Sequence, residues 1–236
     1  MEIKILFDSK RLNRKYSMGW GISYLINDQV LFDTGERSSY LFGNMKQMGI
    51  NISDIKAAVI SHDHWDHTNG LWDLLKRNPD LDLYMCPDFS QQFRNKLEKY
   101  DCTIIEAKSF MSITDGIYTT GQIEGMYHSD YIAEQALVLE TDKGLTIMTG
   151  CAHPGIIKIV EYVTANIKKN IYLIMGGFHL LKKSVSEIKN INDTFHQLSI
   201  EHIGPSHCTG EEAFAIFQES FKANCIDIKV GKTIEV

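Results

Sequence analysis

The chain has 236 residues, a net charge of −6 and an ordinary hydrophobic share of 44%. The acidic balance argues against a basic nucleic-acid-binding surface, and no apolar run approaches the ~20 residues that a membrane-spanning helix requires. The length suits a single domain, residues 1–236, and the first residues lack the layout of a secretion signal. We therefore expect a cytoplasmic protein without nucleic-acid or membrane partners, and the sequence predicts no oligomeric state.

Short apolar runs that end at turn residues predict the strands of the first half of the chain. They are residues 3–7, 21–26, 29–32, 55–60, 81–85, 103–106 and 116–120. Apolar residues at helical spacing predict three helices between these strands. Ser38 or Ser39 is expected to cap the first helix, the second follows Gly70, and the third covers residues 90–100.

The second half repeats this pattern of strands followed by helices. A turn at Asp142-Lys143-Gly144 predicts a hairpin between residues 136–140 and 145–148. Later strands are predicted at residues 171–175, 226–230 and 233–236. Helices are predicted after Pro154, from Ser184 or Ser186 to Leu198, and over residues 211–221, with Pro154 in the first turn of its helix. Two such halves predict an α/β chain folded as an α+β four-layer αββα sandwich, with two sheets packed face to face and helices outside.

The stretch from Ser61 to His67 carries three histidines and two aspartates directly after an apolar strand. Open α/β folds place ligand sites at this position, between the C-terminal end of a strand and a helix. His62 and His64 are two residues apart and can point the same way, while Asp66 and His67 can reach a second ion. Imidazole and carboxylate groups suit Zn²⁺, Fe and Mn²⁺, so the stretch predicts a metal site.

Other polar residues also lie at predicted strand ends. The later histidines in such positions are His153, His179 and His207. Strand ends on one edge of a sheet converge, so these side chains can meet the first cluster. Asp33 also ends a strand, where it can either orient a ligand histidine or form an Asx turn. The three remaining histidines, His128, His196 and His202, have no such setting.

The five cysteines include no Cys-x-x-Cys pair and are expected to be reduced thiols. Cys151 and Cys208 each lie near a histidine of interest. They can be packing residues or groups that support the metal ligands, and packing is the favoured interpretation.

These motifs, in order along the whole chain, resemble the metallo-β-lactamase superfamily. They are His62-x-His64-x-Asp66-His67, Thr149-Gly150-Cys151-Ala152-His153-Pro154-Gly155-Ile156, Gly176-Gly177-Phe178-His179-Leu180 and Pro205-Ser206-His207-Cys208-Thr209-Gly210. They look like the branch of dihydropterin–ribofuranosylaminobenzene phosphate synthase. The resemblance implies the metallo-β-lactamase fold.

The resemblance also implies two divalent ions, expected to be Zn²⁺, with Mn²⁺ or Fe²⁺ as alternatives. One would be held by His62, His64 and His153, and the other by Asp66, His67 and His207. Members of the superfamily usually carry an aspartate that bridges the two ions after a late strand. Here the matching strand ends in Gly-Gly-Phe-His, so His179 is expected to be a substitute ligand, a proton donor or a substrate contact.

The expected activity is hydrolysis of a small anionic substrate, with phosphate-containing molecules among the candidates, by a metal-bound hydroxide. Asp66 and His179 are the predicted catalytic residues, with Asp66 orienting the water and His179 acting as the acid. His179, Lys182, Lys183 and Trp65 are the predicted substrate-binding residues. Lys182 and Lys183 can instead be an exposed pair, and Met18, Trp20 and Trp65 can line a pocket for a flat ring or pack in the core. A β-lactam substrate is not expected, because enzymes of that kind are exported.

Three other functions are weaker alternatives. The branch resemblance supports a transferase that joins a pterin methyl diphosphate to an aryl amine. A diiron oxidoreductase is disfavoured because relatives of that kind carry Glu where this chain has His64. A non-catalytic metal-dependent binding protein is disfavoured because structural zinc sites are usually closed and rich in cysteine.

Overall fold

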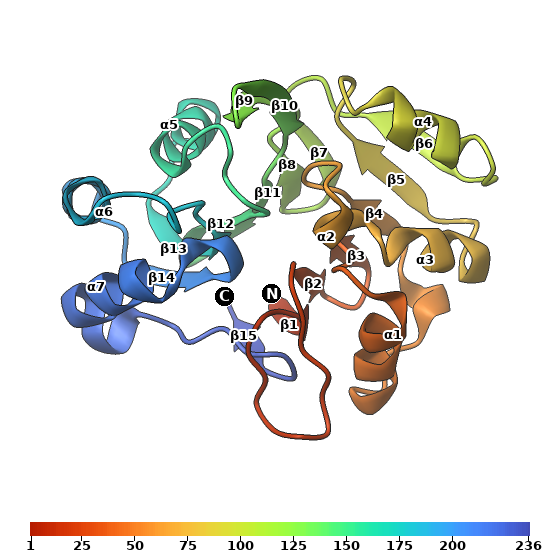
Figure 1. The fold of residues 1–236 in the computed structure, drawn as a ribbon, viewed down its shortest axis with the longest axis horizontal. Coiled ribbons are helices and arrows are strands. Elements are labelled where there is room, and N and C mark those ends of the chain that lie inside the picture. The colour runs from red at the N-terminus through yellow and green to blue at the C-terminus, as the bar shows by residue number, and fades with distance from the viewer.

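The structure is a computed structural model that describes residues 1–236. Its two large sheets are each covered by helices on the outer side (Figure 1). The first sheet has the order β15 (Thr233–Glu235), β1 (Glu2–Phe7), β2 (Ser23–Ile26), β3 (Val30–Phe32), β4 (Ala57–Val59), β5 (Asp82–Met85), β6 (Thr103–Glu106). The second has the order β14 (His202–Ser206), β13 (Ile171–Gly177), β12 (Gly144–Thr149), β11 (Leu137–Thr141), β8 (Ile117–Thr119), β7 (Met111–Thr114). A separate hairpin consists of β9 (Ile123–Tyr127) and β10 (Asp130–Glu134).

The helices divide between the two sheets. Those beside the first sheet are α1 (Ser38–Gln47), α2 (Trp65–Thr68), α3 (Leu71–Arg77) and α4 (Gln91–Leu97), and those beside the second are α5 (Ile156–Asn166), α6 (Val185–Gln197) and α7 (Glu211–Phe221). None of the helices combines the length and the apolar character needed to cross a membrane.

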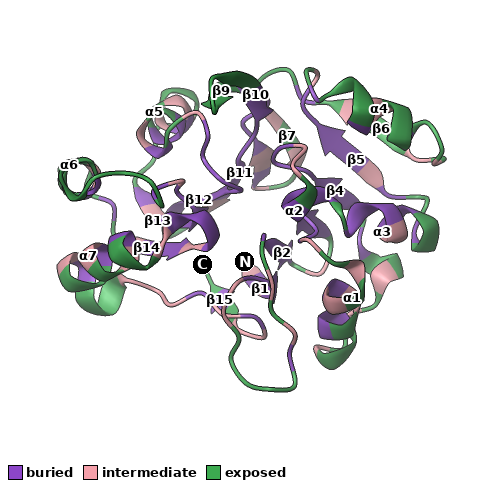
Figure 2. Cartoon of the chain, in the orientation of Figure 1, coloured by how far each residue is buried: buried purple, intermediate pink, exposed green.

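Three apolar layers hold the four-layer sandwich together. Alternate residues of a strand point to opposite faces, and in β4 Val59 packs between the sheets while Ala58 packs toward the helices. In β13, Leu173 and Ile174 divide in the same way. Figure 2 shows the resulting pattern, with buried strands inside and exposed helix surfaces outside. The predicted αββα sandwich is confirmed.

Two helix starts differ from their predictions. Helix α1 has Arg37 at its N-cap, because the Ser38 hydroxyl donates instead to Asp73 Oδ2, 2.6 Å away on α3. Helix α5 begins after Gly155, whose φ of +96° suits glycine, so Pro154 precedes the helix rather than standing in its first turn. Ser184 is the N-cap of α6, as expected, and forms a capping box with Glu187.

Strands β7, β9 and β10 were not predicted from the sequence, and β14 was predicted only as a strand end before His207, without bounds. Strands β9 and β10 are joined by the two residues His128 and Ser129, both with positive φ, as a type I′ hairpin requires. This turn lacks the Asn-Gly or Asp-Gly pair that usually identifies it, which explains the miss. The strand predicted over residues 226–230 is wrong, because that segment forms only one isolated bridge, at Val230, and the other bridge nearby is formed by Cys225, which precedes it.

Parallel strands position the site. Strands β3 to β6 run parallel in the first sheet, and β12 to β14 run parallel in the second. The C-terminal ends of β4, β12, β13 and β14 lead directly into the segments that carry the predicted histidines. Because the sheets pack face to face, these ends meet along one edge of the sandwich.

Candidate metal centre

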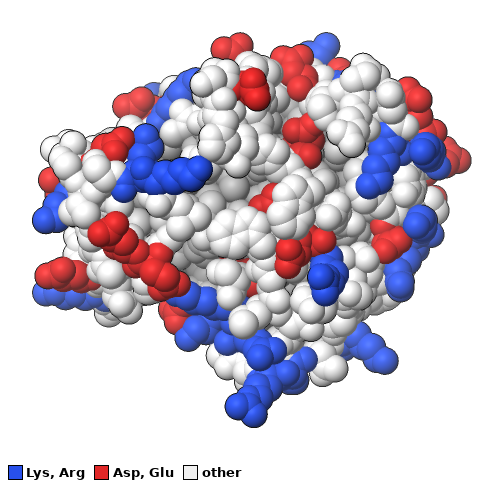
Figure 3. All heavy atoms as spheres, viewed as in Figure 1, with Lys and Arg blue, Asp and Glu red and all other residues white.

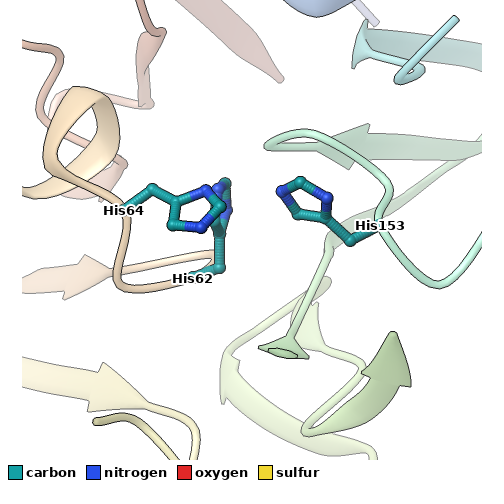
Figure 4. Close-up of side chains that lie close together, drawn as sticks. All are labelled: His62, His64 and His153. Atoms are coloured by element: carbon teal, nitrogen blue, oxygen red, sulfur yellow. The ribbon is translucent and has the colours of Figure 1, made fainter. Parts of the chain in front are cut away.

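The first histidine cluster combines two loops from opposite sheets. His62 and His64 follow β4, and His153 follows β12, and their rings face one another (Figure 4). One ring nitrogen from each lies within 4.8 Å of the others, which is close enough for a shared ion. Buried His62 Nε2 and both ring nitrogens of His153 have no hydrogen-bond partner. Buried polar atoms are nearly always satisfied, so this arrangement fits a bound cation.

Burial keeps this cluster in the neutral form that metal ligands require. It lowers the pKa of His62 well below the usual value for histidine, and the neighbouring histidines lower it further. Burial likewise lowers the pKa of His153 to about 2, together with the charges of His179 and His64.

The second cluster joins Asp66 and His67 at the start of α2 to His207 after β14. Asp66 Oδ2 lies 3.4 Å from His67 Nε2 and 3.3 Å from His207 Nε2. These separations exceed the length of an ordinary hydrogen bond, up to about 3.2 Å. Two ligands of one tetrahedral Zn²⁺, each about 2.0–2.2 Å from it, lie about 3.4 Å apart. The spacing therefore fits three ligands around one ion.

The Asp33 carboxylate orients histidines of both clusters through hydrogen bonds. Its Oδ1 accepts the Ser61 N–H at 2.7 Å, and its Oδ2 accepts both the Ser61 hydroxyl and the His67 Nδ1–H at 2.7 Å. The Ser61 hydroxyl in turn accepts from His62 Nδ1–H, 2.9 Å away. Both histidines thus carry their proton on Nδ1 and leave Nε2 free for a metal. Of the two roles considered for Asp33, orienting ligand histidines is the one that the structure supports.

The proximity of carboxylates also sets the charge of His67. Burial alone would lower the pKa of His67, but Asp33 and Asp66 raise it to about 10. The metal-free site therefore holds a proton where an ion could bind, and the two compete.

Glu134 at the end of β10 has a similar supporting role that the sequence analysis did not find. Its buried carboxylate accepts the backbone N–H groups of Cys151, Ala152 and His153 at 2.7–2.9 Å. Burial raises the pKa of Glu134 to about 7, although these N–H groups act in the opposite direction. The contacts fix the loop that presents His153. A lone glutamate in a missed hairpin gives no sequence signal for this role.

His179 lies beside the first cluster and not beside the second. Its ring centroid is 4.4 Å from that of His153, and its ligand atom groups with those of Cys151 and His153. Interaction with Cys208 raises the pKa of His179. A raised pKa and a position beside the first cluster suit the predicted acid better than a replacement ligand for the second ion.

A cavity of about 680 Å³ opens over the two clusters. Its rim is formed by the exposed apolar side chains of Trp20, Trp65, Met126, Tyr127 and Leu181. Figure 3 shows that uncharged residues dominate the centre of this face. Trp20 and Trp65 are 39% and 54% exposed, so both line the cavity and neither is part of the core. Met18 is also exposed but does not line the cavity.

Lys182 and Lys183 are exposed and also line the cavity. Lys183 pairs with Glu187 at 3.0 Å, which leaves Lys182 as the freer cation.

The hairpin of β9 and β10 supplies two residues that sequence reasoning overlooked. The Tyr127 ring lies 4.8 Å from that of His64 and 5.1 Å from that of His153. His128, which does not lie at a predicted strand end, follows Tyr127 and lines the cavity. His196 and His202 lie outside it, as expected.

Comparison with known proteins finds sequence and structural similarity to the metallo-β-lactamase superfamily. Residues 22–101 match the family model described as Metallo-beta-lactamase superfamily. The chain is 27% identical to the 7,8-dihydropterin-6-methyl-4-(beta-D-ribofuranosyl)-aminobenzene-5'-phosphate synthase of Methanocaldococcus jannaschii, over 91% of this chain and 89% of that protein. It is 29% identical to the crystal structure of Tm1679, described as a metal-dependent hydrolase of the beta-lactamase superfamily, with a TM-score of 0.83 over 100% and 99% of the two chains. The short form of human tRNase Z, 11% identical, shares the fold with a TM-score of 0.63 over 100% and 99% of the two chains.

Proposed function

Because this chain belongs to the metallo-β-lactamase superfamily, we propose that it is a hydrolase that uses two divalent metal ions. His62, His64 and His153 would hold one ion, and Asp66, His67 and His207 would hold the other. The spacing of Asp66 from its two histidines, 3.4 and 3.3 Å, carries the proposal. The ring nitrogens of His62, His153 and His207 without hydrogen-bond partners add independent support.

Two such ions would activate water at neutral pH and stabilise negative charge on a carbonyl or phosphoryl oxygen. Two residues of the chain orient the attacking water and donate a proton. Asp66 orients the attacking water, since its carboxylate faces the cavity from the start of α2. His179 gives its proton to the leaving group from the edge of the cavity, and the raised pKa keeps that proton available.

The cavity favours a small anionic substrate with an apolar part. Its volume of about 680 Å³ falls in the range of ligand pockets, about 300–1,000 Å³. Lys182 offers a cation for a phosphate or carboxylate group, and the apolar rim can cover a ring. We infer Zn²⁺ as the ion, because imidazole and carboxylate ligands near tetrahedral spacing suit it.

The proposal is tested first by elemental analysis of protein purified without chelator. About two metal ions per chain are expected in the native protein and also in His179→Ala, because His179 lies apart from the second cluster. Fewer than one ion per native chain would contradict the two-metal proposal. One ion in the variant would make His179 a ligand and remove it as the acid.

The role of His179 is tested with two phosphodiesters that differ in the leaving group. Loss of a general acid should slow release of an alkyl alcohol by about 10²–10⁴-fold. Release of 4-nitrophenolate, which needs no proton, should change little. His128→Ala, which removes another histidine lining the cavity, should affect both substrates equally. An equal loss with both substrates in His179→Ala would refute the acid role.

A transferase is the second candidate function, favoured by the similarity to the archaeal synthase along 91% of this chain. In that reaction the two ions would bind a leaving diphosphate, and the apolar rim would hold the pterin and aryl rings. The test is incubation with a pterin methyl diphosphate and an aryl amine. A condensation product together with free diphosphate supports the transferase, and its absence at every metal loading eliminates it.

A further inference from the structure

The thiol of Cys151 lies between the two clusters. Its sulfur is 3.5 Å from His67 Nε2, and the sulfur, His67 and His62 each have a ligand atom within 4.8 Å of the others. It also groups with His153 of the first cluster and with His207 of the second. Cys151 is only 5% exposed, and what exposure it has faces the cavity. No carboxylate of the chain joins members of both clusters in this way.

The spacing suits direct coordination. A thiolate about 2.3 Å from a tetrahedral ion and an imidazole nitrogen about 2.1 Å from it lie about 3.6 Å apart. The observed 3.5 Å agrees with this value. The nitrogens without partners on His62, His153 and His207, all in side chains at least nine-tenths buried, surround the same space. They are observations independent of the cysteine and point to cations there.

The end of β13 lies against the loop that carries Cys151. This is the strand end that lacks the usual bridging aspartate. A side chain at Gly177 would collide with Gly150 O and with the Cys208 sulfur, and its Cβ would be 3.3 Å from Cys151 Cα. The loop that carries Cys151 therefore packs against the end of β13, where Gly177 has no room for a carboxylate side chain.

We propose that Cys151 is a metal ligand shared by the two ions, with its thiolate replacing the absent bridging carboxylate. The inference rests on the two-metal site of the proposed function. Coordination releases the thiol proton to solvent, since a coordinating thiol is deprotonated. No oxidation is involved. This proposal assigns Cys151 a role in holding both ions, whereas the sequence alone favoured a packing role over a supporting one.

Cys208 provides a matched control because it is equally buried and lines the same cavity. Its sulfur groups with Cys151 and His207 but with no histidine of the first cluster. It also lies 3.6 Å from the Cys151 carbonyl oxygen, which its thiol can bond. A thiolate at Cys208 could reach at most one of the two clusters.

The test uses Co²⁺, whose bond to a thiolate gives a charge-transfer band in the near ultraviolet that imidazole and carboxylate ligands do not give. Native protein, Cys151→Ser, Cys151→Asp and Cys208→Ser are stripped of metal and titrated with Co²⁺ under a thiol-free reductant. The band should grow over two equivalents in native protein and in Cys208→Ser. It should be absent from both Cys151 variants.

The two Cys151 variants should differ in metal content. Cys151→Ser should bind the second ion at least about tenfold more weakly, since even residues behind a ligand contribute about 10–100-fold. Cys151→Asp should keep two ions because it restores a carboxylate, and it still decides the outcome if the serine variant does not fold.

Three results would overturn the inference. They are two bound Co²⁺ ions without the band in native protein, a band that survives in Cys151→Ser, and a band that disappears in Cys208→Ser. Native protein that binds no Co²⁺ would overturn the proposed function as well, so the two failures are distinguishable.

Discussion

Replacing Asp33 by Asn tests whether one buried carboxylate prepares both metal clusters. The Ser61 N–H is a fixed donor at Oδ1, so the amide oxygen must face it and the amide NH₂ must take the place of Oδ2. There the NH₂ donates to His67 Nδ1 and moves the ring proton to Nε2. The Ser61 hydroxyl loses its acceptor and donates to His62 Nδ1, with the same result. Both metal-facing nitrogens then carry protons.

The expected loss follows from the role of such outer contacts. Mutating a partner that orients a ligand histidine typically lowers metal affinity about 10–100-fold, or about 1.4–2.7 kcal/mol. Because Asp33 reaches His67 directly and His62 through Ser61, we expect losses of this size for both ions. The side chains of Asn and Asp have nearly the same volume, so the fold should persist.

Competition for Zn²⁺ with a chromophoric chelator measures both affinities, and ¹⁵N NMR of the histidine rings reports which nitrogen carries the proton. The control is Asp63→Asn, which makes the same chemical change within the histidine stretch. The Asp63 carboxylate accepts the Ser90 N–H and forms no hydrogen bond with a ligand histidine, so affinity should change far less than in Asp33→Asn. Native affinity in Asp33→Asn, with His67 still protonated at Nδ1, would refute the reasoning.

Three further predictions concern the surroundings of the site. In chelator-treated protein, the pKa of His67 is raised to about 10 from 6.5 in the unfolded chain. Protonated His67 therefore stabilises the fold fully below pH ~6.5, and this stabilisation is lost as the pH rises toward 10. The melting temperature should fall across that interval, and a flat profile would contradict the ion pair. Glu134→Gln should lower stability by about 1–3 kcal/mol and weaken Zn²⁺ binding, because an amide NH₂ must face a backbone donor; exposed Glu124→Gln should do neither. Gly150→Ala should destabilise the fold by about 1–3 kcal/mol in denaturant titrations because its Cβ collides with the Ser61 hydroxyl, whereas Gly43→Ala, in open space on α1, should stabilise it by about 0.5–1 kcal/mol.

The sequence by itself determined the parts of this protein that depend on short-range patterns. Strand β4 and the histidine stretch after it are contiguous, so the apolar run and the metal-ligand spacing are both visible in one short segment, residues 55–67. The second-half helices α6 and α7 also have clear start signals, at Ser184 and Glu211. The order of strands and helices was sufficient to predict two sheets with helices outside.

Tertiary structure decided the contacts that complete the site. Asp33 meets His67 across 34 positions of sequence, and Glu134 meets His153 across 19, so no local pattern announces either pair. The hairpin that carries Tyr127 was not predicted, because its turn contains His128 and Ser129 instead of a glycine. The position of Cys151 is also decided by tertiary structure, since its sulfur reaches both clusters only after the two sheets have packed face to face. Residue types and short spacings specify which groups can bind metal, whereas packing of distant segments fixes their orientation, protonation and shared ligands.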